Sequence, residues 1–443
     1  MSVSTYPAKI SKLHIFKLSL PIFFSNIAIP LVGIIDTGLM GHLSSEKFLI
    51  STSISATVIT LIFWSFGFLR MGTTGLISQS LGKGDYREQP LIILRNLILA
   101  LFISLFIILF KPLIIYLISF FFKPSSDVLK LINDYISIRV FSAPAEFCIY
   151  ILVGFYLGIQ KTYISSSIAI LFSLLNIFFS IFFVNELNLN VKGVAYGSLV
   201  ASYITSIIFL IFTYLYIIKK FKVIPKIQKN LMNARKIIKL FNVNFDIFIR
   251  TILLTFAFLW ITYLGSLIGE KYIAVNSILL QFIVISAFFL DAYAFSIEGI
   301  VGYNVGRRSQ KSFLNAIKNS FQLSFFSGIA ISILFIFFSK DIINLITDLD
   351  ILRFFSYKYI FWVIIIPPIA SFCYQFDGIF IGASQTKEMR NAMIMSVSLY
   401  VLISLYFLKL FGNHGLWISL IIFFIVRSLT LNMYFFRITK RLT

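Results

Sequence analysis

The chain has 443 residues, of which 59% are hydrophobic and only 12% are charged, and its net charge is +21. Soluble domains average about 45–50% apolar and about 25% charged residues, so this composition excludes an ordinary soluble domain and indicates a polytopic membrane protein. A basic balance of this size would suggest nucleic-acid binding in a soluble protein, but here we expect Lys- and Arg-rich cytoplasmic loops and no nucleic-acid partner.

Twelve apolar stretches are long enough to cross a bilayer as helices, since a span needs about 20 apolar residues. Backbone groups in lipid must be hydrogen-bonded within their own segment, so we expect an all-α fold. The expected spans are residues 15–41, 49–80, 91–122, 131–158, 163–184, 194–218, 247–268, 272–305, 313–338, 354–382, 390–411 and 415–436.

The distribution of Lys and Arg predicts the orientation of these spans. With the N-terminus inside, the cytoplasmic segments carry more than twice as many basic residues as the outer segments. Arg139 is counted among the residues of the outer segments. The first apolar run lacks a small-residue cleavage site, so we expect no cleavable signal. These features predict a multi-pass protein of the cell's inner (plasma) membrane with both termini in the cytoplasm.

The first span contains a single charge, Asp36, within the apolar stretch 22–43. A carboxylate near the middle of a membrane helix costs about 2.5–3.5 kcal/mol to insert, which favours a role in binding an ion, a proton or a cargo. The alternative is a carboxyl that is kept protonated or paired for packing alone. Pro21 and Pro30 lie in the same helix and each removes a backbone hydrogen bond, so they are candidate hinges or static kinks.

Five carboxylates lie well inside the expected spans, namely Asp36, Glu146, Asp291, Glu298 and Asp377. Asp291 and Glu298 are seven residues apart, so they share one helix face. Desolvation favours the protonated form of a buried acid, whereas a nearby cation favours the ionised form. A proton and a cationic cargo are therefore natural exclusive ligands, which is the physical basis of antiport.

Three basic residues lie inside spans, Arg70, Arg250 and Arg427. Of these, we expect Arg70 and Arg250 to be buried and to need partners. Salt bridges that clamp a lobe are one interpretation, with Glu146 as a candidate partner of Arg70, and binding of anionic cargo is the other. Pro367 and Pro368 are expected to bend or break the tenth span. We see no cofactor, metal-ligand or nucleophile–base signature, so we expect no cofactor and no enzyme.

The basic segment 219–245 divides the chain into an N-lobe, residues 1–218, and a C-lobe, residues 246–443, with six spans each. The two halves match when the sequence is shifted by 224 positions, which pairs Gly154 with Gly378 and Gly158 with Gly382, among others. Repeats with an even number of spans share one orientation, so we expect them to be related by a pseudo-two-fold axis along the membrane normal, with cargo and coupling sites near the midplane.

Several stretches resemble the multidrug and toxic compound extrusion (MATE) family, and within it the DNA-damage-inducible (DinF) branch. They include PLVGIIDTGLMGHL (30–43), RMGTTGLISQSLGKGD (70–85) and DGIFIGASQTKEMRNAM (377–393). The resemblance implies two six-helix lobes in a V that rock about a central cleft. It also implies export of cationic or amphipathic organic compounds by antiport against protons or sodium.

The resemblance also assigns candidate residues. The family's coupling carboxylate corresponds to Asp36 and an asparagine of the fifth helix to Asn176, whereas Ser180 stands where relatives often have an aspartate. An N-lobe with one acid suits a proton better than sodium. The C-lobe acids that match the branch are Asp291, Glu298 and Asp377, and its matching basic positions are Arg70 and Arg250.

We therefore expect a proton-coupled exporter, H⁺ being favoured and Na⁺ remaining possible. Its partners would be a small-molecule organic cargo and the lipid bilayer, and we expect a monomer. A flippase for lipid-linked or other anionic substrates is the main alternative, although five buried acids against two buried arginines argue against it. A non-transporting scaffold or sensor is a third alternative, in which the embedded acids would not be needed.

Overall fold

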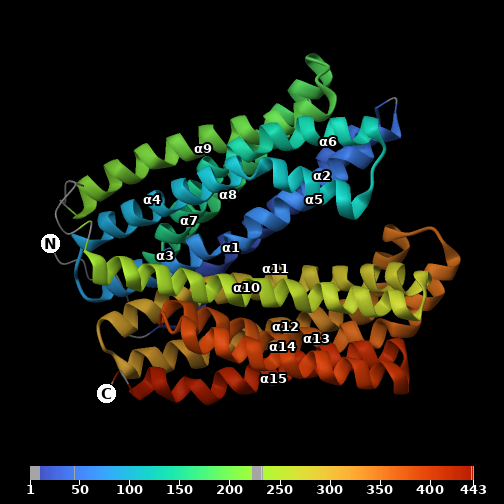
Figure 1. Ribbon diagram of the computed structural model, residues 1–443. Helices are drawn as coiled ribbons and strands as arrows, with labels where there is room; N and C mark the ends of the chain where they lie inside the picture. The colour runs from blue at the N-terminus through green and yellow to red at the C-terminus, as the bar shows by residue number, and fades with distance from the viewer. Residues whose placement is uncertain (1–9, 44, 222–230, 232, 441, 443) are drawn as a thin grey trace. The chain divides into compact units, whose positions relative to one another are not determined.

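The structure is a computed structural model that describes residues 10–43, 45–221, 231, 233–440 and 442. The regular secondary structure of these residues is helical (Figure 1). In chain order the helices are α1 (Lys12–Gly41), α2 (Glu46–Ser65), α3 (Phe68–Gly82), α4 (Glu88–Leu109), α5 (Lys111–Phe122), α6 (Ser126–Arg139), η1 (Val140–Ser142), α7 (Ala143–Gly158), α8 (Thr162–Ile181), η2 (Phe182–Glu186), α9 (Asn190–Phe221), α10 (Ala234–Ile268), α11 (Glu270–Gly306), α12 (Gln310–Ile346), α13 (Asp350–Gly382), α14 (Thr386–Phe411) and α15 (Asn413–Lys440).

Twelve segments of the described chain are long and apolar enough to cross a membrane, which confirms the predicted number of spans. Three of them join consecutive helices, namely α2 with α3, α6 with α7 through η1, and α8 with η2. The third predicted span, 91–122, is wrong in its extent, because α4 ends at Leu109 and the shorter apolar helix α5 follows. Pro112 lies in the first turn of α5, where its missing N–H costs nothing.

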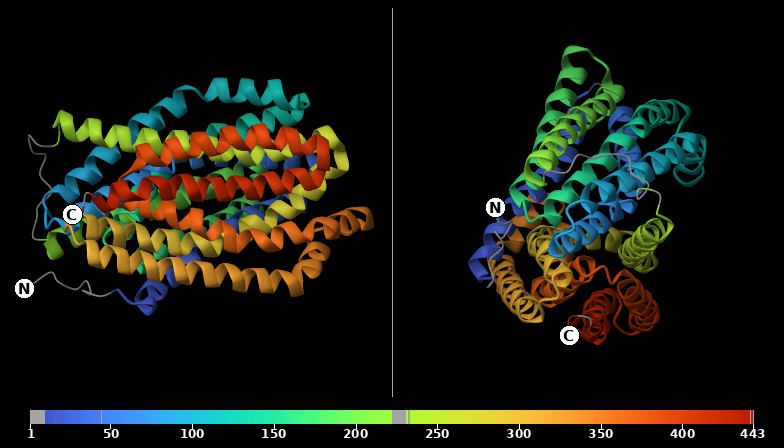
Figure 2. Two further views of the ribbon diagram at one scale, coloured as in Figure 1. Left: turned by 90° about the horizontal axis from the view of Figure 1, so that it is seen from below. Right: turned by 90° about the vertical axis from the view of Figure 1, so that its left-hand side faces the viewer.

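The chain forms two compact units. The N-unit comprises residues 24–241, and the C-unit comprises the described residues up to Phe23 together with those from Asn242 onwards. Within each unit the long helices run along a common direction (Figure 1, Figure 2). The boundaries proposed from sequence assign each predicted span to one lobe, whereas the compact units divide both α1 and α10.

The first turns of α1 pack within the C-unit. Asn315 and Asn319 both donate hydrogen bonds to the carbonyl of Ile10, at 3.0 and 2.7 Å. Further along α1, the hydroxyls of Ser19 and Ser296 lie 3.0 Å apart. The polar contacts of Ile10 and of Ser19 explain why the start of α1 packs with α11 and α12.

The first turns of α10 pack within the N-unit in a similar way. Glu88, at the start of α4, forms ion pairs with Arg95 at 2.7 Å and with Lys236 of α10 at 2.5 Å. The Nε of Arg95 also donates to the carbonyl of Leu231 at 3.0 Å. Glu88 thus attaches the described end of the basic segment to α4.

The internal repeat is visible in how two pairs of helices approach each other. A Cβ on Gly154 of α7 would lie 2.4 Å from the carbonyl oxygen of Arg70 in α3, and a Cβ on Gly378 of α13 would lie 2.4 Å from the carbonyl oxygen of Ala294 in α11. Both members of the second contact are displaced by 224 positions from the first. Small residues permit such close approach of membrane helices, so the glycines matched by sequence perform the same packing task in each unit.

The proline-containing helices are continuous. α13 runs through Pro367 and Pro368, so of the two predicted outcomes they do not break it, and a bend at this point stays a prediction. Pro368 leaves the carbonyl of Ile364 without its usual helical donor, and Ser332 of α12 supplies one at 2.5 Å. α1 also runs through Pro21 and Pro30, and their role as hinges stays a prediction.

Candidate functional site

Asp36 lies in the N-unit part of α1, in the turns before the helix ends at Gly41. Its Oδ1 is buried without a hydrogen-bond partner among the described residues. The hydroxyl of Ser180, on α8, lies within hydrogen-bonding reach of the carboxyl group. An acid held by a neutral hydroxyl, with one oxygen free, can accept a proton or a small cation.

A chain of neutral polar groups extends from Ser180. Its hydroxyl contacts Oδ1 of Asn176 at 3.2 Å, and Nδ2 of Asn176 donates to the hydroxyl of Ser198 in α9 at 3.0 Å. All three side chains are buried. Gly197 permits this arrangement, because a Cβ there would lie 2.6 Å from the Ser180 hydroxyl. The structure therefore brings together Asp36, Asn176 and Ser180, and their role in coupling stays a prediction.

Arg139 is a functional candidate that the sequence analysis missed, because it was counted with the outer segments. It is only 9% exposed and forms an ion pair with Glu146, which is 8% exposed. Ser142 also donates to Glu146, at 2.9 Å. Seven residues separate Arg139 from Glu146, a helical spacing that could have revealed the pair. Pairing of Glu146 with Arg70, a buried residue of α3, stays a prediction.

The C-unit holds its acid very differently. Oδ2 of Asp377, on α13, accepts from both Arg250 of α10 and Arg427 of α15. All three side chains are more than nine-tenths buried. Asp291 of α11 lies close enough to act electrostatically on both arginines. Arg427 was seen in a span from sequence but was not chosen as a site residue.

Glu298 lies two turns beyond Asp291 on α11 and is fully buried. Its backbone carbonyl is the atom against which Gly382 packs, at 2.3 Å from a Cβ built on that glycine. The structure thus places Asp291 beside the arginine cluster and Glu298 at a tight helix contact.

The position of the C-unit that corresponds to Asp36 at the repeat shift is Trp260, and Ser180 corresponds to Ser404. The indole Nε1 of Trp260 donates to the hydroxyl of Ser404 at 2.9 Å. The contact between the equivalent helices is therefore kept in both units. In the C-unit, however, a side chain that neither ionises nor binds cations through oxygen replaces the acid.

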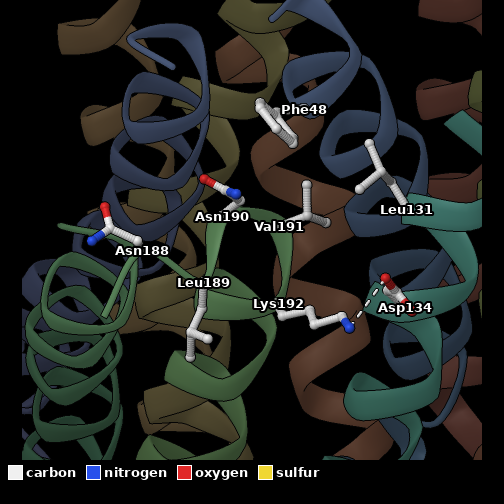
Figure 3. A pocket seen from close by; sticks show the side chains of 8 residues that line it. All are labelled: Phe48, Leu131, Asp134, Asn188, Leu189, Asn190, Val191 and Lys192. Carbon is white, nitrogen blue, oxygen red and sulfur yellow. Dashed lines mark ion pairs between the residues drawn. The ribbon is translucent and has the colours of Figure 1, made fainter. Parts of the chain in front are cut away.

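A separate cavity of about 300 Å³ in the N-unit is lined by residues of α2 and α6 and by the start of α9 (Figure 3). Lys192 and Asp134 form an ion pair at 3.3 Å on its wall. Its lining residues are Phe48, Leu131, Asp134, Asn188, Leu189, Asn190, Val191 and Lys192, and none of them is a predicted site residue.

Within the described part of the chain, no three His, Cys, Asp or Glu side chains are grouped so that they could hold a metal ion. Cys148 and Cys373 are free and buried.

Comparison with known proteins shows two matches to one family model. The model, described as MatE, matches residues 21–182 and again residues 247–408. A duplicated match of this kind agrees with the internal repeat found in the sequence and in the glycine contacts.

Three relatives match over much of the chain. DNA damage-inducible protein F of Escherichia coli is 32% identical over 94% of this chain and 90% of its own length. Protein DETOXIFICATION 43 of Arabidopsis thaliana is 23% identical over 76% of this chain and 62% of its own. Multidrug export protein MepA of Staphylococcus saprophyticus is 22% identical over 53% of this chain and 52% of its own.

Solved structures share the fold at low identity. A MATE protein in a straight conformation superposes with a TM-score of 0.87 at 18% identity, covering 98% of this chain and 97% of that one. A multidrug resistance MATE transporter in an outward-facing conformation gives the same values. A MOP superfamily transporter from Pyrococcus furiosus gives a TM-score of 0.86 at 18% identity, with 98% and 97% covered.

Proposed function

The chain belongs to the MatE family of membrane transporters, and from this premise we propose that it exports organic cations or amphipathic compounds by proton-coupled antiport. It is a multi-pass transporter of small molecules rather than an enzyme. The protein would lie in the inner membrane as a monomer. Both of its termini would face the cytoplasm. The multidrug export function in the name of one relative supports the proposed class of cargo.

The observation that carries this proposal is the buried Oδ1 of Asp36, which has no hydrogen-bond partner among the described residues. An ionised carboxylate in that position lacks the hydrogen bonds that would compensate for lost water, so it favours binding a proton or a cation. The neighbouring Ser180 and Asn176 are neutral and cannot cancel its charge. A proton and a cationic cargo would therefore compete for one site.

Alternating exposure would convert that competition into transport. In the proposed cycle, a proton arriving from outside neutralises Asp36 and releases the cargo there, and loss of that proton to the cytoplasm restores the site for new cargo. Access would alternate by rocking of the two units, with Pro21 and Pro30 as candidate bending points of α1. Only ligands with different affinities for the two states can drive such a cycle.

The number of carboxylates beside Asp36 favours proton coupling over sodium coupling. Ser180 stands one turn after Asn176, so Asp36 has no second carboxylate on that stretch of α8. A proton needs a single basic oxygen, whereas a metal ion is held by several oxygen ligands, of which charged ones bind most strongly. Sodium coupling would direct attention to Asp291, Glu298 and Asp377 instead.

A flippase for anionic substrates is a second candidate because the buried arginines are more numerous than the sequence analysis assumed. Arg139 and Arg427 join Arg70 and Arg250 as buried cations. Of these, Arg139, Arg250 and Arg427 each bind an acidic side chain. Arginines already paired in this way are poor ligands for an anion, so the exporter remains the better proposal.

The test is ethidium efflux from proteoliposomes that contain the purified protein. A pH gradient and a sodium gradient are imposed separately, on the wild type and on the Asp36→Asn variant. We expect the pH gradient alone to drive efflux from wild-type vesicles, and the variant to match protein-free vesicles. Efflux driven only by sodium would overturn proton coupling, and binding of a pyrophosphate lipid without ethidium efflux under either gradient would favour the flippase.

A further inference from the structure

The cavity of the N-unit and one corner of the C-unit occupy equivalent places in the repeat. Two residues that line the cavity are Phe48 of α2 and Leu131 of α6. At the shift of 224 positions they correspond to Tyr272 of α11 and Phe355 of α13. Each of these residues lies in the first two turns of its helix. The contents of the C-unit corner therefore indicate what the N-unit cavity can accommodate.

The corner of the C-unit holds a cation that belongs to the chain itself. The Nζ atom of Lys271 lies 4.2 Å from the ring centroid of Phe355 and 5.2 Å from that of Tyr272. The two rings stand edge to face, with their centroids 5.9 Å apart. An ammonium group over a ring face is attracted by the ring quadrupole, and grouped aromatic rings recognise quaternary ammonium ligands in the same way. This corner therefore suits a cation beside aromatic side chains.

The equivalent lysine of the N-unit is held elsewhere. Lys47 forms an ion pair with Asp127 at 2.6 Å and does not line the cavity. The cavity wall carries the carboxylate of Asp134 at the position where the C-unit has Lys358. The partner of Asp134 is Lys192 at 3.3 Å, and the two side chains are 27% and 49% exposed (Figure 3). Because ion pairs as exposed as this one are weak, an organic cation can take the place of the Lys192 ammonium.

Two buried hydroxyls lie on the same face of α2 as Phe48. Thr52 and Ser55 follow Phe48 by four and seven residues, which places them along one stripe of the helix. Both hydroxyl oxygens are buried and have no hydrogen-bond partner among the described residues. Buried polar groups are almost always hydrogen-bonded, if not to the chain then to water or a ligand. This stripe therefore offers hydrogen-bonding groups to an occupant that reaches past Phe48.

The C-unit satisfies the equivalent position with its own side chains. Asn276 corresponds to Thr52. It exchanges two hydrogen bonds with Asn413, at 2.8 and 3.0 Å, and accepts a third from Nε1 of Trp417 at 3.0 Å. Asn413 begins α15, which follows α14 after a single residue, whereas three residues, 187–189, connect η2 to α9. The N-unit thus leaves open a corner that the C-unit fills.

We propose that the N-unit cavity binds a small organic cation, with Asp134 as its counter-charge and the ring of Phe48 as its aromatic contact. The volume of about 300 Å³ lies at the lower end of the range for ligand pockets. This inference rests on the proposed function for its class of cargo. In the proposed orientation the starts of α2 and α6 face outside, so the site holds cargo on the outer side. Asp36 does not line the cavity, so this is a second site.

The experiment measures the binding of choline, a quaternary ammonium, to the purified full-length protein in detergent by saturation-transfer NMR of its N-methyl signal. Its uncharged isostere 3,3-dimethyl-1-butanol is the comparison ligand. All measurements use protein that carries Asp36→Asn, so that a cation bound at Asp36 does not contribute. We expect this protein to bind choline about tenfold more tightly than the isostere, because only choline carries the charge that Asp134 attracts.

Three further substitutions at the cavity test the roles of its side chains. Asp134→Asn should weaken choline binding about tenfold by removing the counter-charge. Phe48→Leu should weaken it about threefold and leave the affinity for the isostere unchanged, because only the cation–π attraction is lost. Lys192→Met should strengthen choline binding about threefold, since it removes the ammonium that competes for Asp134. A side chain with a merely structural role would not produce this gain.

The matched control is Asp127→Asn, which removes a carboxylate from an exposed ion pair of the same helix, outside the cavity, and should leave the choline affinity unchanged. Absence of choline binding, equal binding of choline and its isostere, or an unchanged affinity in Asp134→Asn would each overturn the proposal. The measurement requires no gradient and no functional Asp36. Its failure is therefore distinct from failure of the proposed antiport, which the efflux experiment tests.

Discussion

The two units of this protein hold their central acids in opposite ways. Asp36 of the N-unit meets neutral polar side chains, whereas Oδ2 of Asp377 in the C-unit is bound by two arginines. Oδ1 of each acid has no hydrogen-bond partner among the described residues. Breaking a buried ion pair is strongly unfavourable, because it leaves a charge without compensation. We therefore expect the N-unit acid to exchange a proton and the C-unit acid to maintain structure.

The helix packing, by contrast, is the same in both units. Gly154 and Gly378 each pack against a backbone carbonyl at the same separation. Ser180 lies beside Asp36, and Ser404 lies beside Trp260, the residue that corresponds to Asp36 in the repeat. Duplication has thus preserved the scaffold and changed the chemistry placed on it. The following predictions test that division, from the largest expected effect to the smallest.

Asp36→Asn should abolish ethidium efflux driven by a pH gradient, because the amide cannot take up and release the coupled proton. Its folding should be unaffected, since an uncharged side chain is easier to bury than a carboxylate. The control is Trp260→Phe at the equivalent C-unit position, which should retain efflux. Gradient-driven efflux in Asp36→Asn would remove the difference between the units.

Asp377→Asn should destabilise the protein by about 3–5 kcal/mol, because two buried guanidinium groups lose their shared carboxylate. The measurement is thermal unfolding of the purified protein in detergent. A triple variant in which Arg250→Gln and Arg427→Gln accompany Asp377→Asn should recover most of that stability. A melting temperature unchanged in the single variant would mean that Asp377 is not held for structure.

Gly154→Ala and Gly378→Ala should destabilise the protein by similar amounts, each about 1–3 kcal/mol, because the added methyl would overlap a backbone carbonyl that cannot easily move. Gly412→Ala, which meets no atom but has φ +54°, serves as a control for backbone strain without crowding. Chemical or thermal unfolding would measure both. Markedly unequal losses would show that the repeat equivalence does not extend to packing.

Ser180→Ala and Ser404→Ala should have the smallest effects, since each removes one hydroxyl, whose hydrogen bonds are worth about 0.5–1.5 kcal/mol each. We expect Ser180→Ala to shift the pH dependence of efflux, because Ser180 is the hydroxyl beside Asp36. Ser404→Ala should leave that pH dependence unchanged, since its partner is the Trp260 indole. Equal shifts in the two variants would show that the pH dependence arises elsewhere.

Much of the architecture could be predicted from the sequence because membrane spans are recognised by their length and apolar composition. The repeat and its glycines were equally accessible, since a constant shift is visible without coordinates. The break between α4 and α5 was missed because Lys111 and Pro112 lie within a run that is otherwise apolar.

The partners of the buried charges were harder to predict. Which arginine meets which acid depends on helix rotation and depth, and neither is contained in spacing along one chain. Arg427 shows the difficulty, because its partner Asp377 is 50 residues away on another helix. Arg139 and Glu146 are the exception, as their local spacing carries the information.

The division of α1 and α10 between the units has a consequence for any attempt to separate the halves. An N-terminal fragment that ends before Lys236 lacks the partner of Glu88. The complementary fragment lacks Ile10, whose carbonyl accepts hydrogen bonds from Asn315 and Asn319. Each fragment would expose polar groups inside its own bundle. The two halves should therefore fold only when they are synthesised together, because each half contributes a helix segment to the other unit. Neither half would be an autonomous folding unit.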